Sequence, residues 1–140
     1  MNHKHFLKLA KQASQKSTYS AHRRVQIGCI AVYKGTVLAK GWNTDRTHPS
    51  QRRFNVYRYD TDLINSPDKL HAELKVLQAI KYLDIDFSKV KLYVYREYND
   101  GSPAMARPCR ACFEAIHQQG INTIIYSTDD GYAIEKINQK

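Results

Sequence analysis

The chain has 140 residues, 42% of them hydrophobic and 25% charged, with 22 Lys and Arg against 13 Asp and Glu and a formal net charge of +9. This composition is typical of one globular domain, expected over residues 1–140, and it excludes a disordered or fibrous protein. No apolar run approaches the roughly 20 residues of a membrane helix, and Met1–Ala10 lacks the apolar stretch of a signal peptide. We therefore expect a cytoplasmic protein with no membrane partner.

The first predicted elements are a helix and a β-hairpin. From about His5 to Lys16, apolar residues recur at helical spacing, which predicts an amphipathic helix. Residues 25–33 and 36–42 are rich in β-branched and apolar residues and flank Lys34-Gly35, a pattern typical of two strands joined by a tight turn.

Residues 44–69 form a long polar segment, and long loops in compact domains are usually functional or disordered. Five Arg or Lys lie there among aromatic residues. We predict that this segment binds substrate, because guanidinium groups contact phosphates and aromatic rings stack on unpaired bases. The candidate substrate-binding residues are Arg46, His48, Arg52 and Tyr57. A homo-oligomer interface is the alternative, since Tyr and Arg are also enriched at interfaces.

The second half of the chain predicts two helices and three strands. By residue range these are a helix at 67–82, a strand at 90–95, a helix at 108–119, and strands at 122–126 and 132–137. The last two strands are joined by a segment too short for a helix, so they are predicted to pair antiparallel as a hairpin. The whole order predicts an α/β fold, with a five-stranded sheet and helices packed against it.

Two short motifs carry candidate chemistry. His71-Ala72-Glu73 lies near the start of the second predicted helix, and Pro108-Cys109-Arg110-Ala111-Cys112 opens the third. One His and two Cys suit a tetrahedral zinc ion with one position left for water. Two Cys three residues apart in a first helical turn place both sulfurs on one side, where the helix dipole favours thiolate over thiol.

Each motif alone has a simpler interpretation. H-x-E is usually an ordinary helix start, and C-x-x-C also occurs in redox pairs and structural zinc sites. A structural zinc site needs four protein ligands, and none of His22, His48 and His117 has ligand spacing. Cys29 lies within a predicted strand and is predicted to be a small core residue. The missing fourth ligand favours a catalytic zinc ion held by the three motif residues.

H-x-E followed by P-C-x-x-C is the signature of zinc-dependent nucleobase deaminases. With these motifs in this order, the chain resembles the cytidine deaminase-like superfamily over about residues 20–127. The resemblance implies a three-layer α/β fold, with a mixed five-stranded sheet and helices on both faces. It also implies that His71, Cys109 and Cys112 hold Zn²⁺, which makes hydroxide available, and that Glu73 is the general acid and base.

The resemblance further implies where the substrate lies. Asn43, at the end of the second strand, is expected to contact the sugar, and the backbone carbonyl of Ala72 the amino group of the base. The predicted terminal hairpin resembles the branch that contains free-cytidine, phage and bacterial deaminases, which favours cytosine over adenine. Residues 96–107 connect the third predicted strand to P-C-x-x-C and are longer than this connection in many relatives. They are predicted to form an extended hairpin along one side of the substrate pocket.

Charge distribution leaves three functions open. Residues 1–70 carry 13 basic and 4 acidic residues, whereas residues 71–140 carry 9 of each. Such an excess favours anionic partners. The first hypothesis is therefore a cytosine deaminase acting on single-stranded nucleic acid, with DNA slightly favoured over RNA. The second is a salvage enzyme for free deoxycytidylate or cytidine. The third, a zinc-binding module without turnover, does not account for Glu73.

Overall fold

The sheet has six strands in a mixed arrangement. Their bounds are β1 (Gln26–Tyr33), β2 (Thr36–Trp42), β3 (Val90–Glu97), β4 (Pro103–Ala104), β5 (Thr123–Thr128) and β6 (Gly131–Lys136). The order across the sheet is β2-β1-β3-β5-β6, with β4 paired to β3. Among the strands of the described residues, β3 and β5 form the one parallel pair, and β5 and β6 form an antiparallel hairpin. The predicted mixed sheet is confirmed, with the two-residue β4 as an additional strand.

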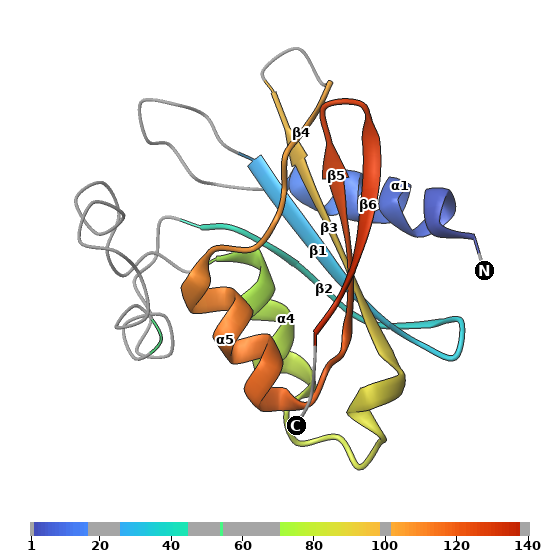
Figure 1. Ribbon diagram of the computed structural model, residues 1–140, viewed down its shortest axis with the longest axis vertical. Coiled ribbons are helices and arrows are strands. Elements are labelled where there is room, and N and C mark those ends of the chain that lie inside the picture. Colours follow the sequence, from blue (N-terminus) through green and yellow to red (C-terminus); the bar gives the residue numbers. More distant parts are fainter. Residues whose placement is uncertain (1, 17–25, 45–53, 55–70, 99–101, 138–140) are drawn as a thin grey trace.

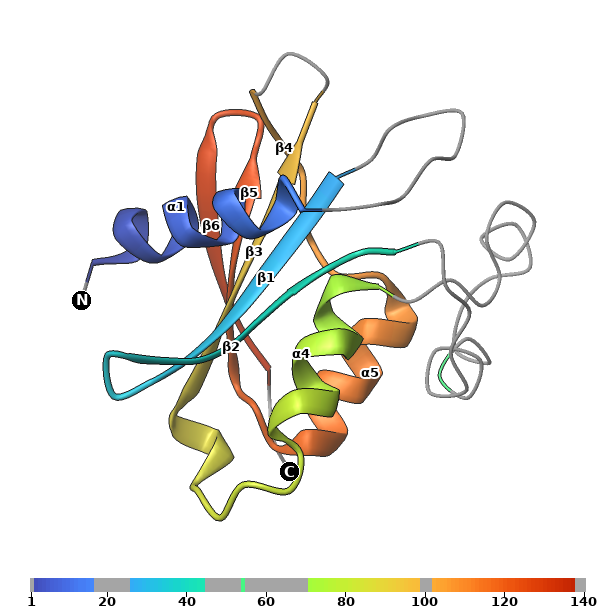
Figure 2. The ribbon, with the colours of Figure 1, turned by 180° about the vertical axis from the view of Figure 1, so that it is seen from behind.

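Helices lie on both faces of this sheet. Their bounds are α1 (His3–Ser14), α4 (Ala72–Ile80), the 3₁₀ helix η2 (Phe87–Lys89) and α5 (Arg110–Gln119). Figure 1 shows α4 and α5 side by side on one face, and Figure 2 shows α1 crossing the other, so the predicted three layers are confirmed. The computed structural model describes residues 2–16, 26–44, 54, 71–98 and 102–137. Within these ranges, none of the helices combines the length and the apolar character needed to cross a membrane.

Local signals explain where the helices begin and end. The side chain of Asn2 accepts a hydrogen bond from the backbone N–H of His5 at 3.0 Å, so α1 begins two residues before the predicted start. Gly120, with φ at 93°, ends α5 as predicted, and its N–H donates to the carbonyl of His117. Cys109 has an extended backbone and is the N-cap of α5 rather than a residue of its first turn.

The core is divided into two layers by the sheet. The smaller layer packs α1 on the sheet through Phe6, Leu7, Ala10, Ile30, Val32, Tyr93 and Ile125. The larger layer lies between the sheet and the pair α4 and α5, and it includes Cys29, as predicted for a small core residue. Each large buried aliphatic or aromatic side chain contributes about 1.5–3 kcal/mol, so both layers contribute to holding the helices against the sheet.

Two glycines permit the helices to approach the sheet closely. A Cβ atom on Gly28 would collide with the backbone of Ala10 and Ser14 in α1. A Cβ atom on Gly41 would lie 2.7 Å from the carbonyl oxygen of Ala72 and 2.8 Å from Cγ2 of Val76, both in α4. The β1–β2 hairpin therefore fixes the position of α1 through one glycine and of α4 through the other.

The connection after β3 folds back as the predicted extended hairpin. Arg96 pairs with Ala104 in the β3–β4 ladder. Ser127 of β5 stabilises the β3–β4 hairpin, because its Oγ donates a hydrogen bond to the carbonyl of Ala104 at 2.6 Å and accepts one from the N–H of Arg96 at 3.0 Å. The N–H of Ala106 then donates to the carbonyl of Ser127 at 2.9 Å, which directs the chain towards Pro108.

Candidate active site at the amino ends of two helices

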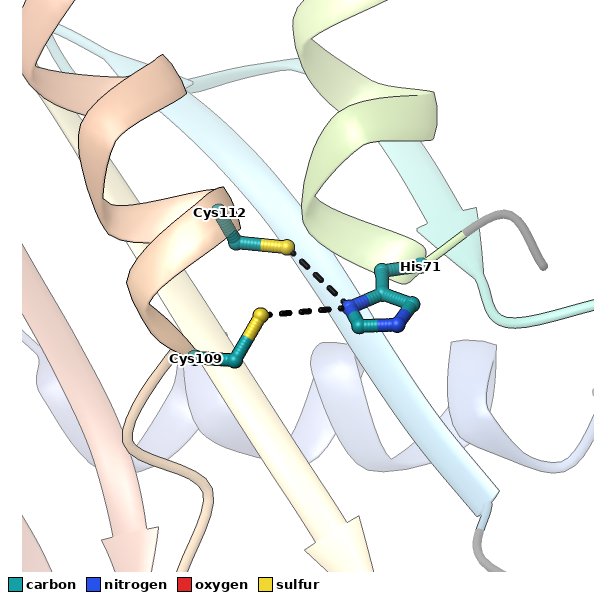
Figure 3. Close-up of side chains that lie close together, drawn as sticks. All are labelled: His71, Cys109 and Cys112. Carbon is teal, nitrogen blue, oxygen red and sulfur yellow. Dashed lines mark hydrogen bonds between the residues drawn. The ribbon is translucent and has the colours of Figure 1, made fainter. Parts of the chain in front are cut away.

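The three predicted metal ligands lie together. Nδ1 of His71 is 3.2 Å from Sγ of Cys112 and 3.5 Å from Sγ of Cys109, and Figure 3 shows both sulfurs directed at this nitrogen. All three donor atoms lie within 4.8 Å of one another. Zinc bonds of about 2.3 Å to sulfur and 2.0 Å to nitrogen place tetrahedral N and S ligands about 3.5 Å apart. The donor types and their spacing therefore fit a zinc ion.

Two helix starts bring these donors together. His71 is the N-cap of α4 and Cys109 the N-cap of α5, and both have extended backbones. Cys112 follows in the first turn of α5 and is fully buried. Because α4 and α5 pack side by side with their amino ends at the same end of the sheet, the ligands meet there (Figure 1). His117 is excluded as a fourth zinc ligand because its position in the sequence does not have ligand spacing. It lies in the last turn of α5, at the opposite end of the helix from Cys109.

The two thiols have opposite pKa shifts. A hydrogen bond from Cys112, followed by one from His71, lowers the pKa of Cys109 to about 3. Burial raises the pKa of Cys112 well above its usual value. Zinc ligation requires both cysteines as thiolates, so metal binding to this pair releases protons.

Glu73 lies buried next to the metal ligands. Its side chain is 4% exposed, and its Oε1 has no hydrogen-bond partner within the described part of the chain. Burial raises its pKa to about 7, against an opposing influence of His71. A buried carboxyl group without a partner for one oxygen costs stability. A group with a pKa near the working pH is also the most effective proton donor and acceptor.

Asn43 is held rigidly where β2 ends. Its side chain is buried, at 6% exposure. The Oδ1 atom accepts a hydrogen bond from the N–H of Ile27 at 3.0 Å, and the backbone N–H of Asn43 donates to the carbonyl of Ile27 at 3.2 Å. These two contacts fix the direction of the amide group. The neighbouring Gly41 packs directly on the start of α4.

Ala72 is the first residue of α4 and is fully buried. Its carbonyl oxygen lies against Gly41, within the contact between α4 and β2. The carbonyl of a first helical residue points along the helix, whereas its N–H points out of the amino end and has no acceptor inside the helix. The N–H of Ala72 is therefore a second candidate for a substrate contact, and the expected contact of its carbonyl with the amino group of the base stays a prediction.

Most of the predicted substrate-binding segment lies outside the described residues. Arg46, His48, Arg52 and Tyr57 lie outside the described residues, as do His22 and residues 67–70 of the second predicted helix. The structure places α4 at Ala72–Ile80, within the range of the predicted helix.

An ion pair that the sequence does not reveal supports the segment before Cys109. Arg107 donates through Nε and Nη2 to the two carboxylate oxygens of Glu135, each at 2.9 Å, and its guanidinium lies 4.9 Å from the ring centre of Phe113. The hydroxyl of Tyr126 donates to the same carboxylate at 3.2 Å. These hydrogen bonds, chiefly those from Arg107, lower the pKa of Glu135. Sequence gives no signal for this cluster because its members are distant along the chain.

Comparison with known proteins identifies the family. Residues 1–128 match the family model of the cytidine and deoxycytidylate deaminase zinc-binding region. A search of curated proteins gave no significant match. The structure is similar to dCMP deaminase from the cyanophage S-TIM5 in apo form, with 24% identity, a TM-score of 0.58, and coverage of 89% of this chain and 80% of that chain.

Two other solved structures show the same fold. The complex of the cyanophage S-TIM5 dCMP deaminase with dCMP and dUMP has 25% identity and a TM-score of 0.56, over 88% of this chain and 78% of that chain. Cytidine deaminase from Burkholderia pseudomallei has 18% identity and a TM-score of 0.63, over 97% and 93% of the two chains.

The family match and the geometry agree. The matched residues include both motifs, and the structure gathers His71, Cys109 and Cys112 into a donor set that fits zinc. The chain belongs to the family of zinc-dependent cytidine and deoxycytidylate deaminases.

Proposed function

We propose that the protein deaminates the cytosine base of a nucleotide by hydrolysis. Water adds at C4, the bond from C4 to the amino nitrogen breaks, and uracil and ammonia are formed. The observation that carries this proposal is the buried carboxyl group of Glu73 beside the zinc-type donor set. A zinc-binding module without turnover would gain nothing from a buried carboxyl oxygen that lacks a partner.

Each residue of the site has a distinct role in this proposal. His71, Cys109 and Cys112 hold the zinc ion. Zinc supplies hydroxide near neutral pH, because it lowers the pKa of water. Glu73 accepts one proton from the attacking water and passes it to the ring nitrogen N3. It then takes the remaining proton from the hydroxyl group added at C4 and passes it to the amino group, which leaves as ammonia while the C4 carbonyl forms. Its raised pKa of about 7 suits both directions of transfer.

Groups near the amino ends of α4 and α5 orient the substrate. The Asn43 amide, fixed by its contacts with Ile27, contacts the sugar of the nucleotide. The N–H of Ala72 donates to an acceptor on the base, because it points out of the amino end of α4. Arg46, His48, Arg52 and Tyr57 remain the predicted contacts to phosphates and flanking bases.

Two forms of substrate are supported by different observations. A free deoxycytidylate is favoured by the similarity to the cyanophage enzyme that was solved with dCMP and dUMP. Cytosine in single-stranded nucleic acid is favoured by the excess of basic residues in the first half of the chain. Within this second form, DNA is slightly preferred to RNA as the proposed substrate. Both forms use the same chemistry at the base.

Uracil formation tests the proposal directly. Zinc-loaded protein is incubated with deoxycytidylate and, separately, with a single-stranded DNA oligonucleotide at the same cytosine concentration, and the Glu73→Gln variant is the control. We expect conversion by the parent protein and a large loss in the variant. Preferred conversion of the oligonucleotide assigns a nucleic-acid deaminase, and conversion of the nucleotide alone assigns a salvage enzyme. No turnover of either, with zinc bound, would overturn the proposed function.

A further inference from the structure

The chain just before Cys109 lies outside regular secondary structure. The N–H of Ala106 donates to the carbonyl of Ser127 at 2.9 Å. The next two residues, Arg107 and Pro108, belong to no helix or strand, and Pro108 has no N–H to donate. Cys109 then begins α5 as its N-cap, and its side chain makes no capping hydrogen bond. The direction of this zinc ligand therefore depends on the side chains that hold the chain before it.

Arg107 is the side chain that holds this segment. Its guanidinium donates to both carboxylate oxygens of Glu135 on β6, and it lies 4.9 Å from the ring centre of Phe113 on α5. The hydroxyl of Tyr126 on β5 donates to the same carboxylate. A bidentate pair fixes orientation as well as distance, because two N–H···O bonds must be aligned at once. One guanidinium thus ties the segment to β6 and to the start of α5.

These contacts lie on both sides of the C-x-x-C motif. Arg107 is two residues before Cys109, and Phe113 directly follows Cys112. The N–H of Phe113 also donates to the carbonyl of Cys109 at 2.8 Å, which links the ring to the first ligand. Cys112 is fully buried within α5, whereas Cys109 is only partly buried. We therefore expect Cys109 to respond more than Cys112 when the contacts of Arg107 change.

We propose that Glu135 is a positioning residue of the zinc site, which by way of Arg107 holds Cys109 in the direction that the metal requires. The inference rests on the proposed function only in that His71, Cys109 and Cys112 bind zinc, and it does not depend on the substrate. The side chains of Arg107 and Glu135 are 52% and 27% exposed, and ion pairs exposed to solvent contribute little to folding stability. Their main contribution is to geometry, since residues that orient metal ligands strongly affect metal affinity.

Metal binding to a single variant tests this role without turnover. Glu135→Gln keeps the size of the side chain and one acceptor oxygen, but it removes the charge and the bidentate pair. Glu114→Gln is the matched control, because it makes the same change on α5 itself, where Glu114 accepts a hydrogen bond from Gln118 at 3.2 Å. Competition with a chelator measures zinc affinity, and the visible absorption of Co²⁺ bound in place of zinc reports the ligand geometry. Thermal unfolding of the metal-free protein measures stability separately.

The expected result is a loss at the metal without a comparable loss of stability. Zinc affinity should fall about tenfold in Glu135→Gln and the Co²⁺ spectrum should change, while the metal-free melting temperature stays close to that of the parent. Glu114→Gln should match the parent protein in all three measurements. Arg107→Gln should show the same loss as Glu135→Gln, and the double variant should lose no more than either single variant, because both residues act through one contact.

Three results would overturn the inference. Parent-like zinc affinity and Co²⁺ absorption in Glu135→Gln would show that the pair does not orient Cys109. A loss that Glu114→Gln shares, or one accompanied by a large fall in the metal-free melting temperature, would show a general effect on stability. If Glu135→Gln does not fold, Arg107→Lys is measured in its place with the same expected loss, because lysine keeps the charge but cannot form a bidentate pair.

The parent protein separates this inference from the proposed function. If the parent binds no zinc, the proposed function fails and the role of Glu135 fails with it. If the parent and Glu135→Gln bind zinc equally well, only the role of Glu135 is contradicted.

Discussion

Glu73 and the zinc ligands differ in what each side chain contributes. Glu73 is buried with one oxygen unpaired among the described residues, an arrangement that typically costs about 1–3 kcal/mol. His71, Cys109 and Cys112 are within ligand distance of one another and provide the donor set. Substitutions at the two kinds of position should therefore have separable effects on activity and on metal content.

Glu73→Gln should abolish proton transfer and retain zinc. The amide keeps the size of the side chain but can neither accept nor release a proton at neutral pH, so kcat should fall by about 10²–10⁴. Steady-state kinetics and metal analysis of the purified variant measure the two effects. Loss of zinc together with activity would show that Glu73 is a metal ligand.

Cys109→Ala should lose zinc, whereas Cys29→Ala should keep it. Both are cysteines near Glu73, but Cys29 lies in the core between β-sheet and helices and outside the donor set. We expect Cys29→Ala to cost about 1 kcal/mol of stability and to leave one zinc ion per chain. Metal analysis after gel filtration distinguishes the two variants, and equal zinc content in both would contradict the assigned ligand set.

At the scale of elements, the β1–β2 hairpin positions one helix on each face of the sheet. Gly28 and Gly41 lie on the same hairpin, but the missing Cβ atoms face α1 and α4 respectively. Only one of these two helices belongs to the active site, because α4 carries Glu73 and α1 carries no residue of the zinc site.

Gly41→Ala should impair both stability and turnover. Its Cβ would lie 2.7 Å from the backbone of Ala72, so α4 must shift, at a cost of about 1–3 kcal/mol. Gly28→Ala should destabilise the protein as well, by displacing α1, with a smaller change in kcat per folded molecule. Thermal unfolding and kcat at a temperature where both variants are folded compare them. A parent-like kcat in Gly41→Ala would show that the start of α4 tolerates displacement.

Sequence predicted most elements to within a few residues, and its errors have local causes. Hairpin and strand patterns located β1, β2, β3, β5 and β6, because runs of β-branched and apolar residues bounded by turn residues leave a clear signal. The helix expected from Pro108 begins two residues later, since Cys109 adopts an extended backbone as the N-cap. The short β4 has no pattern of its own, and hydrogen bonds to Ser127 determine it.

At the scale of the whole molecule, zinc would join two helices whose ligands are 38 and 41 positions apart in the chain. Removing it should lower the melting temperature by several degrees. A ligand at 100 times its dissociation constant stabilises the folded state by about 2.7 kcal/mol. Calorimetry or thermal circular dichroism with chelator, and again after zinc is restored, measures the change. A melting temperature that does not respond to zinc would contradict this link, and Cys109→Ala provides the unresponsive control.

Two short motifs already specify which residue types form the site. H-x-E and P-C-x-x-C identify one His, two Cys and one carboxylate by type and short-range spacing, and such motifs need no tertiary information. How these residues meet depends on packing: the amino ends of α4 and α5 converge, which brings Nδ1 of His71 to within 3.5 Å of both sulfurs. It also brought the ammonium groups of Lys16 and Lys75 to the ring of Trp42. These contacts join residues far apart in the chain, and periodicity within one element carries no information about which distant element packs against it.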